Sequence, residues 1–163
     1  GKSEQNQSCW RRCGRHDEGQ ASVCVRMRPQ VAIEATVHAD MATVWAAWTE
    51  GEHITGWNFA DASWHCPWAK SDVRVGGTYT ARMEARDGSF GFEFGATYTL
   101  VELHKELHST MGDDRKIWVT FEEVPGGVHV VERFEAEDQN PIEMQQAGWQ
   151  MILNNFKAYV EDL

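Results

Sequence analysis

The chain has 163 residues, of which 42% are hydrophobic and 25% charged, which is typical of one globular domain with room for a core. Its formal net charge is −10, and residues 31–163 hold nine basic against 22 acidic side chains. An acidic surface repels nucleic-acid phosphates and anionic lipid headgroups, so we expect neither nucleic acid nor a membrane as a partner. No stretch of about 18 apolar residues is present, and we expect a cytoplasmic protein.

Residues 1–30 differ in composition from the rest of the chain. They are rich in Gly, Ser, Gln, Asn and Arg and show no sustained apolar periodicity, so we expect a disordered or poorly ordered extension before a single domain over residues 31–163. The cluster Cys9, Cys13, His16 and Cys24 lacks the paired spacing typical of zinc sites. A short zinc knuckle stays open as the alternative, but we expect no metal ion and no cofactor.

The region after this extension begins with a strand and two short helices. Apolar and polar side chains alternate over Val31–His38, which indicates a half-buried strand. Asp40 suits the N-cap of a helix over Met41–Trp48, and a second short helix follows through Ile54–Trp57. We expect the next stretch, Trp64–Trp68, to be irregular.

Turn signals then divide the chain into a series of strands. Asp87-Gly88 is typical of a hairpin tip, and further turns are expected at Gly112–Asp114 and Pro125–Gly127. The strands expected between these breaks cover residues 77–85, 89–103, 106–111, 115–124 and 128–136. Because short hairpins connect them, we expect an antiparallel, meandering sheet.

Alternation along these strands places most of the large apolar side chains on one face of the sheet. We expect this face to form the core, with Tyr79, Ala81, Met83, Phe90, Phe92, Phe94, Ile117, Val119, Phe121, Val128, Val130 and Phe134. Glu132 interrupts the pattern between Val130 and Phe134. A buried carboxylate without a partner is costly, so Glu132 must be paired, protonated or in contact with water in a cavity. A structural pair and a role toward a ligand both remain open.

The end of the chain is expected to form one long amphipathic helix from Asn140 to Leu163. Asn140 suits the N-cap, Pro141 the first helical position and Glu143 a capping box. Apolar side chains recur at helical spacing at Ile142, Trp149, Ile152, Leu153, Phe156 and Val160. A curved sheet around such a helix would enclose a cavity.

Several ordered motifs resemble one known family. They are Val44–Thr49, His53–Trp57, Val75–Gly77, Asp87–Phe92, Val119–Glu122, Glu132–Glu135, Asn140–Gln145 and Gly148-Trp149. Together they are similar to the bacterial branch of the family related to activators of the heat-shock protein 90 ATPase, within the START-like or SRPBCC superfamily. The resemblance covers residues 31–163. It implies an α+β helix-grip fold, in which a strand and two short helices precede a bent antiparallel sheet of about six to seven strands wrapped around the long C-terminal helix.

The resemblance also implies a function, because members of this superfamily commonly bind apolar or aromatic small molecules between sheet and helix. We therefore expect a small hydrophobic, aromatic or lipid-like ligand in such a cavity. The residues expected to line it are Trp57, Trp64, His65, Met83, Phe92, Phe94, Phe121, Glu132, Phe134, Gln145 and Trp149. Aromatic walls with a few polar groups suit a flat, mostly apolar ligand, although the same residues could form a plain packed core.

Catalytic patterns in the sequence are weak. His65 and Cys66 are adjacent, and neighbouring strand residues point to opposite faces. His53 and Glu132 could transfer a proton only if the fold brought them together. A cyclase or hydrolase using a pocket carboxylate thus stays an alternative, as does a chaperone-associated interaction domain, and we leave open whether the protein is a monomer or a homodimer.

Overall fold

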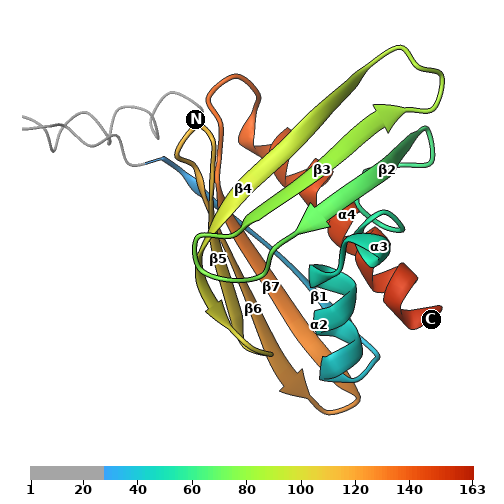
Figure 1. Cartoon of the computed structure of the whole chain (residues 1–163), viewed down its shortest axis with the longest axis vertical. Coiled ribbons are helices and arrows are strands. Elements are labelled where there is room, and N and C mark those ends of the chain that lie inside the picture. The colour runs from blue at the N-terminus through green and yellow to red at the C-terminus, as the bar shows by residue number, and fades with distance from the viewer. Residues whose placement is uncertain (1–27) are drawn as a thin grey trace, which may run out of the picture.

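The computed structural model describes residues 28–163 (Figure 1). Most of the expected N-terminal extension lies outside these residues. So does its whole cysteine and histidine cluster, Cys9–Cys24. In chain order the helices and strands are β1 (Gln30–Val37), α2 (Met41–Thr49), α3 (Gly51–Ile54), β2 (Trp64–Ser71), β3 (Thr78–Ala85), β4 (Gly91–Glu102), β5 (Glu106–Met111), β6 (Lys116–Val124), β7 (Gly127–Glu135) and α4 (Ile142–Glu161).

All seven strands form one antiparallel sheet in the order β1-β7-β6-β5-β4-β3-β2. The strands from β2 to β7 follow one another as neighbours, and β1 pairs with β7 at the far edge. The sheet is curled, and α4 runs from beside β4 down to the C-terminus, with α2 and α3 near its lower end (Figure 1). The expected helix-grip fold is confirmed.

Side chains of α4 attach the helix to the edge strand β1. Three of them donate hydrogen bonds to backbone carbonyl oxygens: Gln146 to Ala32 (3.3 Å), Gln150 to Glu34 (3.2 Å) and Lys157 to Thr36 (2.6 Å). An unpaired edge is a template for aggregation, and covering it with a helix removes that risk. The long helix therefore covers the β1 edge of the sheet as well as its inner face.

The C-terminal half of α4 packs into a solid aromatic core. Phe156 is fully buried, and its ring meets those of Trp48 and Trp57 edge to face, each at a centroid distance of 4.9 Å. Phe121 on β6 adds a further edge-to-face contact with Trp48 at 5.8 Å. The Trp57 indole Nε1 donates to the Ala47 carbonyl at 2.9 Å, so this buried polar group is satisfied.

The stretch Trp64–Trp68, expected to be irregular, belongs to the strand β2 (Trp64–Ser71), so that expectation was wrong. The register with β3 shifts between His65 and Trp68, around Pro67. Proline cannot donate to a sheet, but an irregular edge strand tolerates it. The same irregularity disrupts the apolar alternation that identifies a strand.

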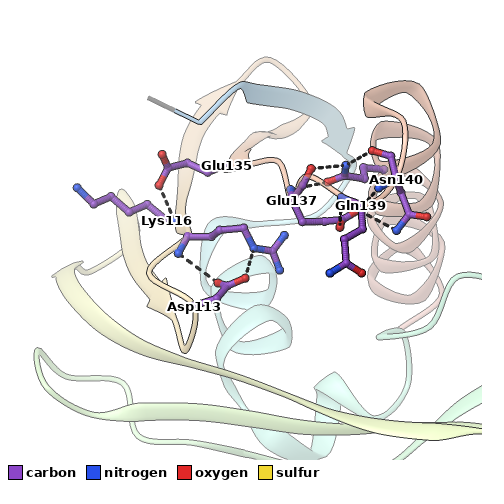
Figure 2. Close-up of polar contacts among 8 residues, drawn as sticks. Asp113, Lys116, Glu135, Glu137, Gln139 and Asn140 are labelled. Atoms are coloured by element: carbon purple, nitrogen blue, oxygen red, sulfur yellow. Dashed lines mark hydrogen bonds and ion pairs between the residues drawn. The ribbon is translucent and has the colours of Figure 1, made fainter. Parts of the chain in front are cut away.

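The two main helices begin differently. Asp40 caps α2 as expected, because its carboxylate accepts a hydrogen bond of 2.7 Å from the backbone N–H of Thr43. No side chain caps α4, and the expected capping box is wrong. The Asn140 amide instead donates to the carboxylate of Glu137 at 2.8 Å, and the backbone N–H of Gln139 bonds the same group (Figure 2). The Asn140 side chain, which was expected to cap the helix, thus bonds Glu137 instead.

Candidate ligand cavity

A cavity of about 640 Å³ lies between the N-terminal half of α4 and the inner face of the sheet. This volume falls in the range typical of small-molecule sites. Its wall includes Gln145, Trp149, Ile152 and Leu153 of α4, residues 57–60 after α3, and inward side chains of β2 to β7. Two residues of the wall, Ala96 on β4 and Ser109 on β5, place small side chains at inward positions.

Trp149 forms the centre of the helical wall. Its ring stacks on Phe134 with a centroid distance of 3.9 Å and an interplanar angle of 11°. The ring of Phe94 meets it edge to face at 6.3 Å. Both arrangements are favourable for aromatic pairs, so Trp149 is held in one orientation beside the cavity.

Glu132 lies on β7 in the wall of this cavity, with 9% of its surface exposed. Its strand neighbours are apolar: Ile33 on β1 and Val119 on β6. No hydrogen bond or ion pair to its carboxyl group is found within residues 28–163. Burial raises the pKa of Glu132 to about 8, since nothing nearby compensates for the lost hydration. The carboxyl group is therefore mostly protonated at neutral pH, and the structural pair that the sequence left open is absent among the described residues.

The hydroxyl groups of two tyrosines in the cavity wall are already partnered. The Tyr79 hydroxyl accepts a hydrogen bond of 2.9 Å from the Asn58 amide, and the hydroxyls of Tyr98 and Ser71 share one of 3.0 Å. Burial raises the pKa of Tyr79 well above its usual value, with smaller contributions from nearby groups that include Glu132. Both tyrosines thus stay neutral at physiological pH.

Gln145 has a structural role at the cavity end where α4 begins. Its amide nitrogen donates to the carbonyl oxygens of Glu137 (3.0 Å) and Asn140 (2.9 Å), and its oxygen accepts from the Glu137 N–H at 2.9 Å. These three bonds hold the chain between β7 and α4 in a fixed turn. The buried amide therefore anchors the start of the helix, which lacks a cap.

Eight of the eleven side chains expected to line the cavity are in its wall: Trp57, Trp64, Met83, Phe92, Phe94, Glu132, Gln145 and Trp149. Three are not. His65 lies 3.6 Å from the carboxylate of Glu84, Phe121 is buried in the aromatic core, and Phe134 is covered by Trp149. Strand alternation predicts which face of the sheet a side chain lies on. It does not predict whether that side chain borders the cavity or is buried beneath another ring. Contact of the eight with a ligand remains a prediction.

Sequence reasoning missed several polar residues of the wall. Tyr79 was expected on the inner face only as part of the core, whereas Tyr98, Ser109 and Asn58 were not singled out. Alternation along β4 and β5 could have indicated Tyr98 and Ser109. Asn58 lies in an irregular segment after α3, where no periodic signal exists.

An exposed aromatic cluster lies next to the cavity. The ring of Trp64 meets those of Phe90 and Phe92 edge to face, each at 6.0 Å, and Trp64 and Phe92 also line the cavity. Phe90 is 62% exposed, so its expected place in the core was wrong. The β3–β4 hairpin extends beyond the rest of the sheet (Figure 1), and its tip has no layer to pack against.

The candidate catalytic pairs are not assembled. His53 shares a hydrogen bond of 2.8 Å with the Tyr159 hydroxyl and is not part of the cavity wall that holds Glu132. Cys66 is buried, and burial raises the pKa of its thiol, which disfavours the reactive thiolate. Within residues 28–163 no group of three or more potential ligands could hold a metal ion. No helix in that part of the chain is long and apolar enough to cross a membrane.

Comparison with known proteins agrees with this architecture. Residues 38–161 match the family described as Activator of Hsp90 ATPase homolog 1-like protein. The chain belongs to this family. Its structure resembles the solution structure of the AHSA1-like protein from Aeromonas hydrophila, with 42% identity, a TM-score of 0.78, and coverage of 82% of this chain and 93% of the other.

Two further solved structures are similar. Chr148 from Cytophaga hutchinsonii shares 42% identity with a TM-score of 0.71, covering 82% of this chain and 92% of that protein. Protein CV1439 from Chromobacterium violaceum is 21% identical with a TM-score of 0.74, covering 82% and 98%, and this likeness concerns the fold alone. No curated protein matches the chain. The expected membership of the Hsp90 ATPase activator homologue-like family is thus confirmed.

Proposed function

We propose that this family member binds a small, mostly apolar, ring-containing molecule in the cavity between α4 and the sheet. The observation that carries the proposal is the cavity itself: about 640 Å³, with aromatic rings in its wall and one carboxyl group that has no partner among the described residues. Sites of this kind gain affinity from apolar burial and orient the ligand through few polar contacts. The ring of Trp149, held by Phe134 and Phe94, offers a flat surface for an aromatic ligand.

The proposal can be tested with 1-pyrenemethanol, a flat neutral probe whose emission reports binding. Because Trp48, Trp57, Trp64 and Trp149 all line the cavity, a bound pyrene should quench tryptophan fluorescence by energy transfer. Ala96→Phe should fill part of the space and weaken binding roughly tenfold or more, since apolar burial of the probe is lost.

Ala158→Phe is the matched control, because Ala158 lies on the exposed side of the same helix. This variant should bind the probe like the unmodified protein. Binding that is unaffected by Ala96→Phe, or absent altogether, would contradict the proposed function. Neither a chaperone-associated domain nor an enzyme is favoured by a contact among the described residues, and a cytoplasmic location stays a prediction.

A further inference from the structure

Glu132 differs from the other ionisable side chains of the cavity wall in having no partner in the part of the chain that the structure describes. The others are hydrogen-bonded within the chain: Tyr79 to Asn58, Tyr98 to Ser71, Arg115 to Asp113, and Glu137 to Gln139 and Asn140. Glu132 is more than nine-tenths buried, and its carboxyl group can be completed only by something that enters the cavity. Within residues 28–163 the cavity wall thus presents one acidic group without a partner, together with several aromatic rings.

The charge of the domain favours a cation at this position. Residues 31–163 carry nine basic and 22 acidic side chains, so the domain attracts cations and repels anions during encounter. Aromatic faces such as those of Trp149 and Trp57 also attract ammonium groups. An anionic ligand would oppose ionisation of Glu132, whereas an ammonium group can pair with the carboxylate once the carboxyl group has released its proton.

We infer that the cavity selects hydrophobic amines, whose apolar body occupies the space beside Trp149 while the ammonium group pairs with the carboxylate of Glu132. This inference rests on the proposed function and adds the chemical class of the ligand. A neutral apolar molecule of the same shape fills the same space but leaves the carboxyl group without a charged partner. Charge-assisted hydrogen bonds are roughly twice as strong as neutral ones, so the amine binds more tightly.

Binding transfers one proton to solvent. The pKa of Glu132 is about 8, so at pH 7 the carboxyl group is mostly protonated before binding. The amine enters as an ammonium ion, the carboxyl group releases its proton, and an ammonium–carboxylate pair results without any covalent bond being made. Affinity for the amine should therefore rise up to about tenfold per pH unit until pH 8, and fall only above the pKa of the amine itself.

No other ionisable group of the wall titrates in this interval. Burial raises the pKa values of Tyr79 on β3 and Tyr98 on β4, and hydrogen bonds lower the pKa of Glu137 before α4. Arg115, before β6, is paired with the carboxylate of Asp113. The wall residues of α2 and of the segment after α3 do not ionise near neutral pH. A pH dependence between 6 and 8 thus reports on Glu132.

The test compares three probes that share the pyrene ring: 1-pyrenemethylamine, 1-pyrenemethanol and 1-pyrenecarboxylic acid. At pH 7.5 the amine should bind at least tenfold more tightly than the alcohol, and the acid should bind least. Calorimetry in two buffers of different ionisation enthalpy should detect the release of nearly one proton per amine at pH 7 and none for the alcohol.

Glu132→Gln should abolish the preference for the amine while leaving binding of the alcohol intact, which also shows that the cavity is folded. Glu93→Gln removes the same charge at an exposed position of β4 and should keep the preference. Equal affinity for amine and alcohol, or a preference that survives Glu132→Gln, overturns the inference but leaves the proposed function standing. Failure of all three probes to bind overturns the proposed function itself.

Discussion

The two halves of α4 have the same apolar spacing but opposite surroundings. Phe156 in the C-terminal half is fully buried against Trp48 and Trp57, whereas Trp149, two turns earlier, borders a cavity. Near the first, α2 and the segment after α3 supply large rings. Near the second, the sheet supplies Phe94 and Phe134 but also small side chains of the cavity wall such as Ala96. An apolar stripe thus shows which side of a helix faces inward, but what lies across from it determines whether the interior is solid.

The halves also differ in how polar groups are satisfied. In the solid half the Trp57 indole donates to the Ala47 carbonyl, and His53 bonds the Tyr159 hydroxyl. In the hollow half the carboxyl group of Glu132 has no partner among the described residues. A stable protein seldom leaves such a group unpaired unless the position serves another purpose. Changes in the two halves should therefore have different consequences.

The largest effect is expected from Glu132→Gln at high pH. In the unfolded chain this carboxyl group ionises near pH 4.5, but in the folded protein only near pH 8. Because the folded protein holds this proton more tightly than the unfolded chain, the free energy of unfolding is highest below pH 4.5. It falls as the pH rises to about 8, by a total on the order of 5 kcal/mol. The glutamine of the variant does not ionise, so its free energy of unfolding does not fall in this way. The variant should therefore match the unmodified protein at pH 4 and be clearly more stable at pH 9.

Urea unfolding at several pH values measures this difference. Both proteins share every other ionisable group, so subtracting their unfolding free energies isolates Glu132. A difference that stays constant from pH 4 to 9 would show that the group ionises normally and that the hollow half is open to bulk water.

Phe156→Ala should give the next largest effect, a loss of roughly 4 kcal/mol, because it leaves a void in the solid half. Phe94→Ala is the matched change in the hollow half. It should cost only about 1 to 2 kcal/mol, since one side of the Phe94 ring already faces empty space and has few contacts to lose. Denaturant unfolding at one pH measures both, and equal losses would contradict the difference between the halves.

A smaller loss is expected where α4 begins. Gln145→Ala removes three hydrogen bonds and leaves backbone groups of Glu137 and Asn140 unpaired, which should cost about 2 kcal/mol. Gln146→Ala, at the next position, removes one long bond from an exposed side chain and should change stability by less than about 0.5 kcal/mol. Thermal unfolding of both variants decides whether Gln145 anchors the helix.

Prediction from the sequence succeeded where the signal was local. The alternation of Val31–His38, the cap at Asp40 and the hairpin at Asp87-Gly88 all depend on neighbouring residues, and each agrees with the structure. The strand β2 was missed because its irregular register removes the alternation. The cap of α4 was assigned wrongly because Glu137, outside the expected motif, competes for the Asn140 side chain.

For the cavity, the sequence singled out Glu132 as an exception to an apolar pattern, and most of the predicted wall residues are in the wall. It could not tell that Phe121 and Phe134 lie beneath other rings, because that depends on which side chains meet across the interior.

The amino-acid sequence by itself determined the order of the helices and strands, the inward face of each and the family, because periodicity, turns and caps act over a few residues. Only the tertiary structure decided where the interior is filled, which polar groups find partners and that Glu132 has none within residues 28–163. The physical reason is that packing and burial depend on contacts between segments distant in the chain, and the residues next to a position in the sequence do not predict these contacts.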